Sequence, residues 1–207
     1  MSEFRILIVE DEPIIAENIA MYLDNADFIV SGIAYDDEEA KKQLKQNTPD
    51  AVLLDINLDS DTDGIEIADY INKNFQLPFL FLTSYADKET LERAKKVAPA
   101  GYIVKPFNEK TLLASIEIAI SNFAQRSNRS VPHLAFEKIN RHLINQVTER
   151  EFEVLQLIYE GKTNQQIAQQ LFISLNTIKR HINNAYLKLD ASSRSTAIAR
   201  LRELMMK

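Results

Sequence analysis

The sequence predicts an α/β domain with a (βα)5 doubly wound parallel sheet, followed by a smaller all-α domain. In the first 120 residues, short apolar runs alternate with segments of helical periodicity, which is typical of parallel strands buried on both faces. From Leu134 onward, the periodic segments are all helical. The pattern changes near Phe123, and 207 residues are enough for two separate cores.

Five apolar runs are expected to form the strands of the sheet, because each is short and rich in β-branched or aromatic residues. The runs cover residues 4–9, 28–34, 51–54, 77–82 and 101–104. The amphipathic segments between them are expected to be helices, the last of them over residues 108–122. Asn108 would cap that helix, because its side-chain oxygen can accept a hydrogen bond from a free amide of the first turn.

The second half of the chain carries helix-start signals in place of strand patterns. Thr148 with Glu151, and Thr163 with Gln166, have the spacing of capping boxes, and Gly161 stands where the first of these helices would end. Helices are expected over residues 148–160, 164–171, 175–189 and 193–205, with a weaker pattern over 135–145.

A polar, aperiodic stretch separates the two patterns. Residues 124–133 contain a proline and no regular apolar spacing, which predicts a linker or a break between helices. We therefore expect a first domain at 1–123, a linker with the weaker helical segment at 124–146, and a helical domain at 147–207.

The net charge of −6 is divided unevenly along the chain. Residues 1–125 carry 11 Lys and Arg against 23 Asp and Glu, a balance of −12, whereas residues 126–207 carry 13 against 7, a balance of +6. A basic second half favours nucleic acid as its partner. The absence of cysteine excludes disulfides, thiolate metal sites and a cysteine nucleophile. No apolar run approaches the roughly 18 residues needed to cross a bilayer, so we expect a cytoplasmic protein with no membrane partner.

Polar side chains stand where four of the predicted strands end. Glu10 and Asp11 follow the first strand, Asp55 the third, Thr83 the fourth and Lys105 the fifth. In an open parallel sheet these carboxyl ends line the ligand crevice. Three crowded carboxylates repel one another and call for a cation, and ligands that are all oxygen favour Mg²⁺. A hydroxyl and an ammonium beside them suit a phosphoryl group added to Asp55.

Residues 1–122 resemble the receiver domain of bacterial two-component response regulators, which has a flavodoxin-like fold. The motifs VEDEP, LLDINL, FLTSYAD and GYIVKPF stand in the order of that family. The resemblance implies that Asp55 accepts a phosphoryl group from a sensor histidine kinase. It also implies a set of Mg²⁺ ligands, namely Glu10, Asp11, Asp55 and the backbone carbonyl of Asn57.

The same resemblance assigns a phosphate-binding and switch group. Lys105 would pair with the phosphate, and Pro106 after it is a candidate for a cis peptide bond that aims the lysine inward. Thr83 and Tyr102 would be the switch pair, whose hydroxyl moves to the phosphate while the ring turns inward.

The loop after Asp55 departs from the family, because it lacks the common proline and is one residue longer before its Asp-Gly. The alternating acids Asp59, Asp61 and Asp63 before Gly64 suggest a calcium loop, but Tyr70 stands where such a loop requires Glu. We therefore expect a solvated acidic loop.

Residues 147–194 resemble the LuxR-type helix-turn-helix domain of the NarL subgroup of response regulators. A scaffold helix over 166–171, a turn at 172–174 and a recognition helix over 175–189 follow from this pattern. The resemblance places groove contacts at Lys179, Arg180 and Asn183. It places residues nearer the phosphates at Thr177, His181 and Lys188.

The combined expectation is a DNA-binding transcriptional response regulator of a two-component system, controlled by phosphorylation of Asp55, and not an enzyme. Its expected partners are a sensor histidine kinase, double-stranded DNA and, when phosphorylated, a second copy of the chain. The expected pairing surface is the helix over 193–205, with Ile198, Leu201 and Leu204.

Two alternatives remain at this stage. One is a Mg²⁺-dependent phosphohydrolase with Asp55 as nucleophile, although the haloacid dehalogenase pattern requires a second Asp where Asn57 stands. The other is a regulator that dimerises through its receiver without phosphorylation.

Overall fold

A computed structural model describes most of the chain, in two separate units. The described residues are 3–24, 26, 28–58, 63–84, 88–128 and 133–207. The first unit is Arg5–Ile120, and the second is Ser121–Lys207 together with Met1–Phe4. Within the described residues, no helix is long and apolar enough to span a membrane.

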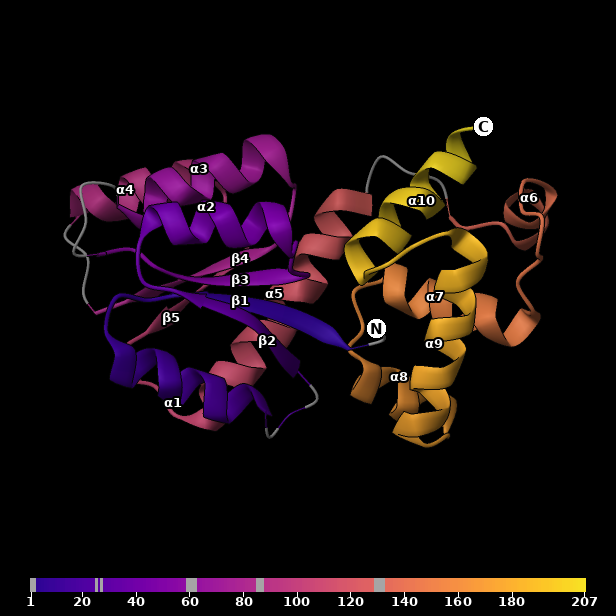
Figure 1. Ribbon diagram of the computed structural model, residues 1–207, viewed down its shortest axis with the longest axis horizontal. Coiled ribbons are helices and arrows are strands. Elements are labelled where there is room, and N and C mark those ends of the chain that lie inside the picture. Colours follow the sequence, from indigo (N-terminus) through magenta and orange to yellow (C-terminus); the bar gives the residue numbers. More distant parts are fainter. Residues whose placement is uncertain (1–2, 25, 27, 59–62, 85–87, 129–132) are drawn as a thin grey trace. The chain divides into compact units, whose positions relative to one another are not determined.

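The first unit is built on a five-stranded sheet in the order β2-β1-β3-β4-β5, which confirms the predicted doubly wound fold (Figure 1). The strands are β1 (Phe4–Val9), β2 (Phe28–Ala34), β3 (Ala51–Asp55), β4 (Phe79–Thr83) and β5 (Gly101–Val104). The pairs β1–β3, β3–β4 and β4–β5 are parallel. The fourth strand starts at Phe79 instead of the expected residue 77, since Pro78 has no amide hydrogen to donate to the ladder.

Helices cover both faces of this sheet. Figure 1 shows α1 and α5 on one face, and α2, α3 and α4 on the other. Their bounds are α1 (Pro13–Asp24), α2 (Asp37–Gln46), α3 (Gly64–Asn74), α4 (Lys88–Lys96) and α5 (Glu109–Asn128). Successive residues of β3 are therefore buried on opposite faces, which is why its sequence is a continuous apolar run up to Asp55.

The last helix of the first unit differs from the expectation at one end. Its start agrees, because Asn108 Oδ1 accepts a hydrogen bond from Thr111 N at 2.9 Å. However, α5 continues to Asn128, so the expected helix end at residue 122 is wrong and the helix extends into the stretch expected to be a linker. Gln and Arg are good helix formers, and a polar composition alone does not stop a helix.

After α5, the described residues of the second unit form helices joined by turns, with no strand. Its helices are α6 (Phe136–Arg141), α7 (Glu149–Tyr159), α8 (Asn164–Leu171), α9 (Leu175–Leu189) and α10 (Arg194–Met206). Both predicted capping boxes are present, at Thr148 and Thr163, and Gly161 has φ 84° just after α7 ends. The weak pattern over 135–145 corresponds to the shorter helix α6.

One core holds this helical unit together. It contains residues of both the scaffold helix and the recognition helix, with Ile167, Ile178 and Ile182 fully buried. Leu201 and Leu204 of α10 are also fully buried in this core. The expected pairing surface on α10 is therefore wrong for these two leucines, because their side chains are used inside the unit and are not available to a second copy.

The turn between α8 and α9 contains an unfavourable backbone conformation. Phe172 ends α8 with φ 55° and ψ 40°, in the left-handed region, and its side chain is 93% exposed. A non-glycine residue pays a steric penalty in this region, whereas Asn tolerates it better. No burial of the ring offsets that penalty within the described residues.

We expect Phe172→Asn to raise the free energy of unfolding of the helical unit by about 0.5–1 kcal/mol. Chemical denaturation followed by circular dichroism measures this change. Ile144→Asn is the matched control, because Ile144 is an exposed apolar residue whose φ is not positive. A Phe172→Asn protein no more stable than the Ile144→Asn protein would contradict the expectation.

Candidate functional site

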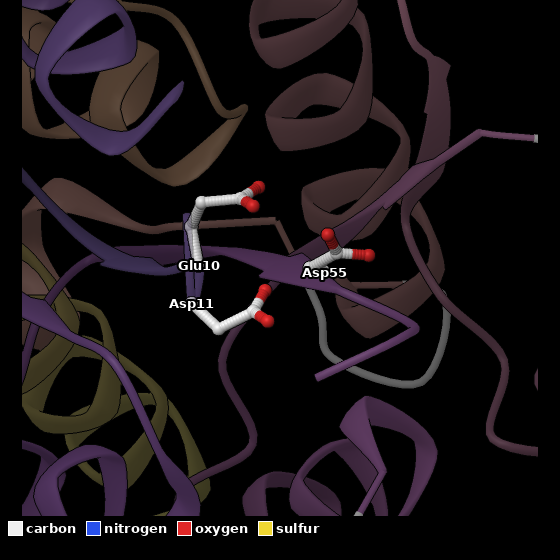
Figure 2. A group of neighbouring side chains, drawn as sticks. All are labelled: Glu10, Asp11 and Asp55. Atoms are coloured by element: carbon white, nitrogen blue, oxygen red, sulfur yellow. The ribbon is translucent and has the colours of Figure 1, made fainter. Parts of the chain in front are cut away.

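The carboxyl edge of the sheet gathers the side chains that the sequence places there. Glu10 and Asp11 follow β1, and Asp55 is the last residue of β3. Figure 2 shows Glu10 and Asp11 extending from adjacent positions toward the same side as Asp55. One carboxylate oxygen from each of the three lies within 4.8 Å of the other two. The predicted cluster of three carboxylates is therefore present.

Lys105 supplies the positive charge in this cluster. Its Nζ lies 2.7 Å from Glu10 Oε2 and 2.5 Å from Asp55 Oδ2. Burial alone would lower the pKa of Lys105, but its hydrogen bonds to both carboxylates raise the pKa above the ordinary value. The lysine therefore stays charged and bridges the ends of β1, β3 and β5.

Glu10 is the most deeply buried acid of the cluster, with 0% of its surface exposed. Burial, opposed by the hydrogen bond from Lys105, raises the pKa of its carboxyl to about 7. The negative charge of Asp55 acts in the same direction as burial. A cation placed among these oxygens would favour the ionised form of Glu10, so the donor set fits a hard divalent ion such as Mg²⁺.

Asp55 is 4% exposed and is held from two sides. Its Oδ1 accepts a hydrogen bond from the Asn57 amide at 2.9 Å, while its Oδ2 is bound by Lys105. Asn57 is itself exposed. Its position next to the cluster is compatible with a role for its carbonyl in holding a metal ion.

The expected switch residues occupy the neighbouring strands. Thr83 ends β4 and is buried, and its Oγ1 has no hydrogen-bond partner among the described residues. Tyr102 of β5 is 38% exposed, and its ring centroid lies 5.9 Å from that of Phe81. The Lys105–Pro106 peptide bond is cis. The buried Thr83 hydroxyl is thus available for a new hydrogen-bond partner, and the Tyr102 ring is partly exposed to solvent.

Gly64 is a part of the site that sequence reasoning did not single out. A Cβ built on this residue would overlap the carbonyl oxygen of Asp55. Asp63 before it caps α3 and pairs with Arg93 at 2.6 Å, so this acid has a structural role, whereas Asp59 and Asp61 lie outside the described residues. The Asp-Gly spacing was the signal: only glycine lets α3 begin against the backbone of Asp55.

A hollow of about 430 Å³ lies beside the cluster, on the side of α1. Its lining includes Glu12 and Tyr22 from the α1 side, and Lys105 and Phe107 from the segment after β5. Lys105 and Pro106, which also lines the hollow, were expected from the sequence, whereas the other lining residues were not. The hollow leaves room beside the site for a side chain from a partner.

The recognition helix is the second candidate site. Arg180 and Asn183 are exposed, whereas Lys179 and His181 are partly buried. Thr177 is partly buried too, and its amide and hydroxyl are hydrogen-bonded to the Ser174 side chain that caps α9. The exposed side also contains Asn176, Asn184 and Leu187, which the sequence analysis did not name.

Lys188 differs from the other expected DNA contacts. Its Nζ lies 2.7 Å from Oε2 of Glu151, a nearly buried carboxylate in the capping box of α7. Burial alone would raise the pKa of Glu151, but Lys188 and the amide of Thr148 hold it below its ordinary value. Lys188 therefore joins α9 to the start of α7.

Comparisons with known proteins match both parts of the chain to families. Residues 6–117 match the response regulator receiver domain, and residues 145–201 match the luxR family of bacterial regulatory proteins. The response regulator VraR of Staphylococcus aureus (strain NCTC 8325 / PS 47) is 30% identical over 201 residues, which covers 94% of each chain. The transcriptional regulatory protein LiaR of Bacillus subtilis (strain 168) is 28% identical over 210 residues, covering 93% of this chain and 94% of LiaR.

Solved structures match the first unit. The signal receiver domain of a modulated diguanylate cyclase from Desulfovibrio desulfuricans G20 has a TM-score of 0.57 and 37% identity, over 60% of this chain and 98% of its own. The receiver domain of NtrX from Brucella abortus has a TM-score of 0.52 and 30% identity, over 55% of this chain and 96% of its own. The chain belongs to the response regulators that join a receiver domain to a LuxR-type DNA-binding domain. This is a family of transcriptional regulators and not of enzymes, which removes the phosphohydrolase alternative.

We expect Gly64→Ala to abolish Mg²⁺ binding at the cluster and to destabilise the first unit by about 1–3 kcal/mol, because the added methyl group must displace the backbone of Asp55. Calorimetric Mg²⁺ titration and thermal unfolding measure the two effects. Gly101→Ala is the matched control, since the nearest atoms to its Cβ would be those of Ala119 and Leu80 at 3.5 Å, an ordinary contact. If the two variants bound Mg²⁺ equally well and were equally stable, the close approach of Gly64 to the Asp55 backbone would not be needed for the site.

We also expect Mg²⁺ affinity to rise with pH between about 6 and 7 and to level off above. Below its raised pKa of about 7, Glu10 is protonated, and the metal ion must displace that proton. Calorimetric titrations at several pH values measure the dependence. Glu10→Gln should bind Mg²⁺ more weakly and lose this dependence, so a pH slope as steep in the variant as in the original protein would refute the role of Glu10.

Proposed function

We propose that the chain is a phosphorylation-dependent transcriptional regulator in which Asp55 accepts a phosphoryl group from a sensor histidine kinase. The observation that carries the proposal is the buried Asp55 carboxylate, bound by Lys105 at 2.5 Å and grouped with Glu10 and Asp11 within 4.8 Å. In the transfer, an Asp55 oxygen forms a bond to phosphorus as the phosphorus–nitrogen bond of the kinase phosphohistidine breaks. The freed imidazole is the leaving group.

Charge is the main obstacle to this transfer, because an anionic carboxylate must meet an anionic phosphoryl group. Mg²⁺ held by Glu10, Asp11, Asp55 and the Asn57 carbonyl would neutralise the phosphoryl oxygens. Lys105 would turn from Asp55 to the new phosphate, since its ammonium is already positioned and charged. The hollow beside Lys105 supports access by the kinase side chain.

The proposed switch uses Thr83 and Tyr102. A buried hydroxyl without a partner is costly, and a phosphoryl oxygen would satisfy it. Movement of Thr83 toward the phosphate would vacate space beside β4, into which the half-exposed Tyr102 ring could turn. The receiver surface around β5 would thereby change with the chemical state of Asp55.

We propose that the changed receiver surface favours a homodimer, which presents two recognition helices to double-stranded DNA in the cytoplasm. Lys179, Arg180 and Asn183 would lie in the major groove, with Thr177 and His181 nearer the phosphates. Exposure of Arg180 and Asn183 supports this assignment. The ion pair with Glu151 favours a structural role for Lys188 in place of its expected phosphate contact.

Asp55→Asn should abolish the mass gain of one phosphate when the protein is incubated with a small acyl phosphate and Mg²⁺. The substitution removes the attacking carboxylate oxygen and changes little else in size. Intact-mass spectrometry is the measurement, and Asp69→Asn, on a half-exposed acid of α3, is the matched control that should keep the gain. Phosphate retained in the Asp55→Asn protein would place the acceptor elsewhere. An unmodified original protein would favour regulation without phosphorylation.

A further inference from the structure

The solvent-facing side of α9 is built mainly from carboxamides. Five residues of the helix are exposed, and they are spaced by four, three, one and three positions, so they fall on one face. They are Asn176, Arg180, Asn183, Asn184 and Leu187. We call this set the α9 stripe.

The rotation of α9 within its domain is fixed by its other side. Ile178, Ile182, Ala185 and Leu189 are all fully buried in the core of the helical unit. Lys188 is tied to Glu151 at 2.7 Å. The helix is therefore unable to turn other residues outward without breaking this core. The α9 stripe, with the partly buried Lys179 beside it, is the surface that the helix offers to a groove.

The chemistry of the α9 stripe differs from that of a basic helix. It carries one formal charge, on Arg180, beside three carboxamides and one leucine. In the major groove, a carboxamide pairs with adenine through two hydrogen bonds, to N7 and from N6, whereas arginine pairs in the same way with guanine N7 and O6. A stripe of this composition discriminates bases more than it neutralises phosphates.

The spacing along the helix sets the length of DNA that the stripe can read. Asn176 and Asn183 are seven residues apart, which corresponds to about 10.5 Å along the helix axis. Base pairs are stacked about 3.4 Å apart, so the two side chains reach bases about three steps apart. Arg180 lies between them.

We propose that α9 recognises an adenine-containing half-site, with adenines read by Asn176 and Asn183 and a guanine read by Arg180 within the same few base pairs. This inference rests on the proposed function, because it assumes that α9 enters the major groove. It adds the base chemistry of the operator, which the family assignment leaves open. The carboxamide groups give the specificity, and Arg180 adds a guanine contact.

Selection from a random duplex library tests the proposal with the full-length protein, with and without a small acyl phosphate and Mg²⁺. The expected result is a half-site with two adenines about three steps apart and a guanine between them, on either strand. Asn183→Ala should lose the preference at one adenine. Its affinity for the selected site should fall roughly 5-fold to 150-fold, which corresponds to about 1–3 kcal/mol.

Atomic substitution in the DNA separates a direct contact from an indirect effect. Replacing the adenine read by Asn183 with 7-deazaadenine removes the N7 acceptor. This should weaken binding by the original protein and leave binding by the Asn183→Ala protein unchanged. Asn145→Ala, on an exposed asparagine outside α9, is the matched control and should keep the original preference. Alanine is a better helix former than asparagine, so the α9 variants are expected to fold.

The outcomes distinguish the inference from the proposed function. Selected half-sites without adenine, or an unchanged preference in both Asn176→Ala and Asn183→Ala, would overturn the inference while DNA binding stands. Enrichment of no duplex by the original protein, in either phosphorylation state, would overturn the proposed function and the inference together.

Discussion

The ammonium of Lys105, held between the buried carboxylates of Glu10 and Asp55, is the interaction on which the first unit's chemistry depends. The parallel sheet creates it, because β1, β3 and β5 all end at one edge and each delivers one of the three groups. Burying such charges costs several kcal/mol per ion before the pairing repays it, so stability alone is a weak reason for this arrangement. The proposed role of the cluster in receiving a phosphoryl group accounts for the arrangement better. On the proposed function, the apolar run of β3 ends on Asp55 because the strand holds the phosphoryl-accepting carboxylate at that edge.

The helical unit places its charges differently. Lys188 is used inside the unit, where it offsets the burial of Glu151. Buried Arg194 donates to the Ile158 carbonyl at 3.0 Å and so closes the end of α7. The second half of the chain therefore has less positive charge available to contact DNA than its surplus of basic residues suggests. On the proposed function, recognition of DNA depends more on the exposed side of α9, whose other side is fixed by the core.

Much of this could be predicted from the sequence, and the exceptions have physical causes. The five strands, two of the three capping boxes and the carboxylate cluster follow from local patterns and from the rule that parallel strands end together. The end of α5 did not follow, because a polar stretch such as 124–128 can form a helix when nothing in it breaks one. The roles of Gly64, Lys188 and Leu201 could not be predicted from local sequence patterns either. Each depends on a neighbour distant in sequence, namely Asp55 for Gly64, Glu151 for Lys188 and the shared helical core for Leu201.

The central claim is that the chemical state of Asp55 controls the affinity of α9 for DNA. Its most direct test is the dissociation constant of the full-length protein for one duplex, measured at fixed salt before and after phosphorylation. Typical coupling free energies of about 1–3 kcal/mol predict binding that is roughly 5-fold to 150-fold tighter after phosphorylation. The Asp55→Asn protein, treated with the same reagents, should keep the affinity of the unmodified state. Equal affinity of the phosphorylated and unphosphorylated proteins would contradict the claim.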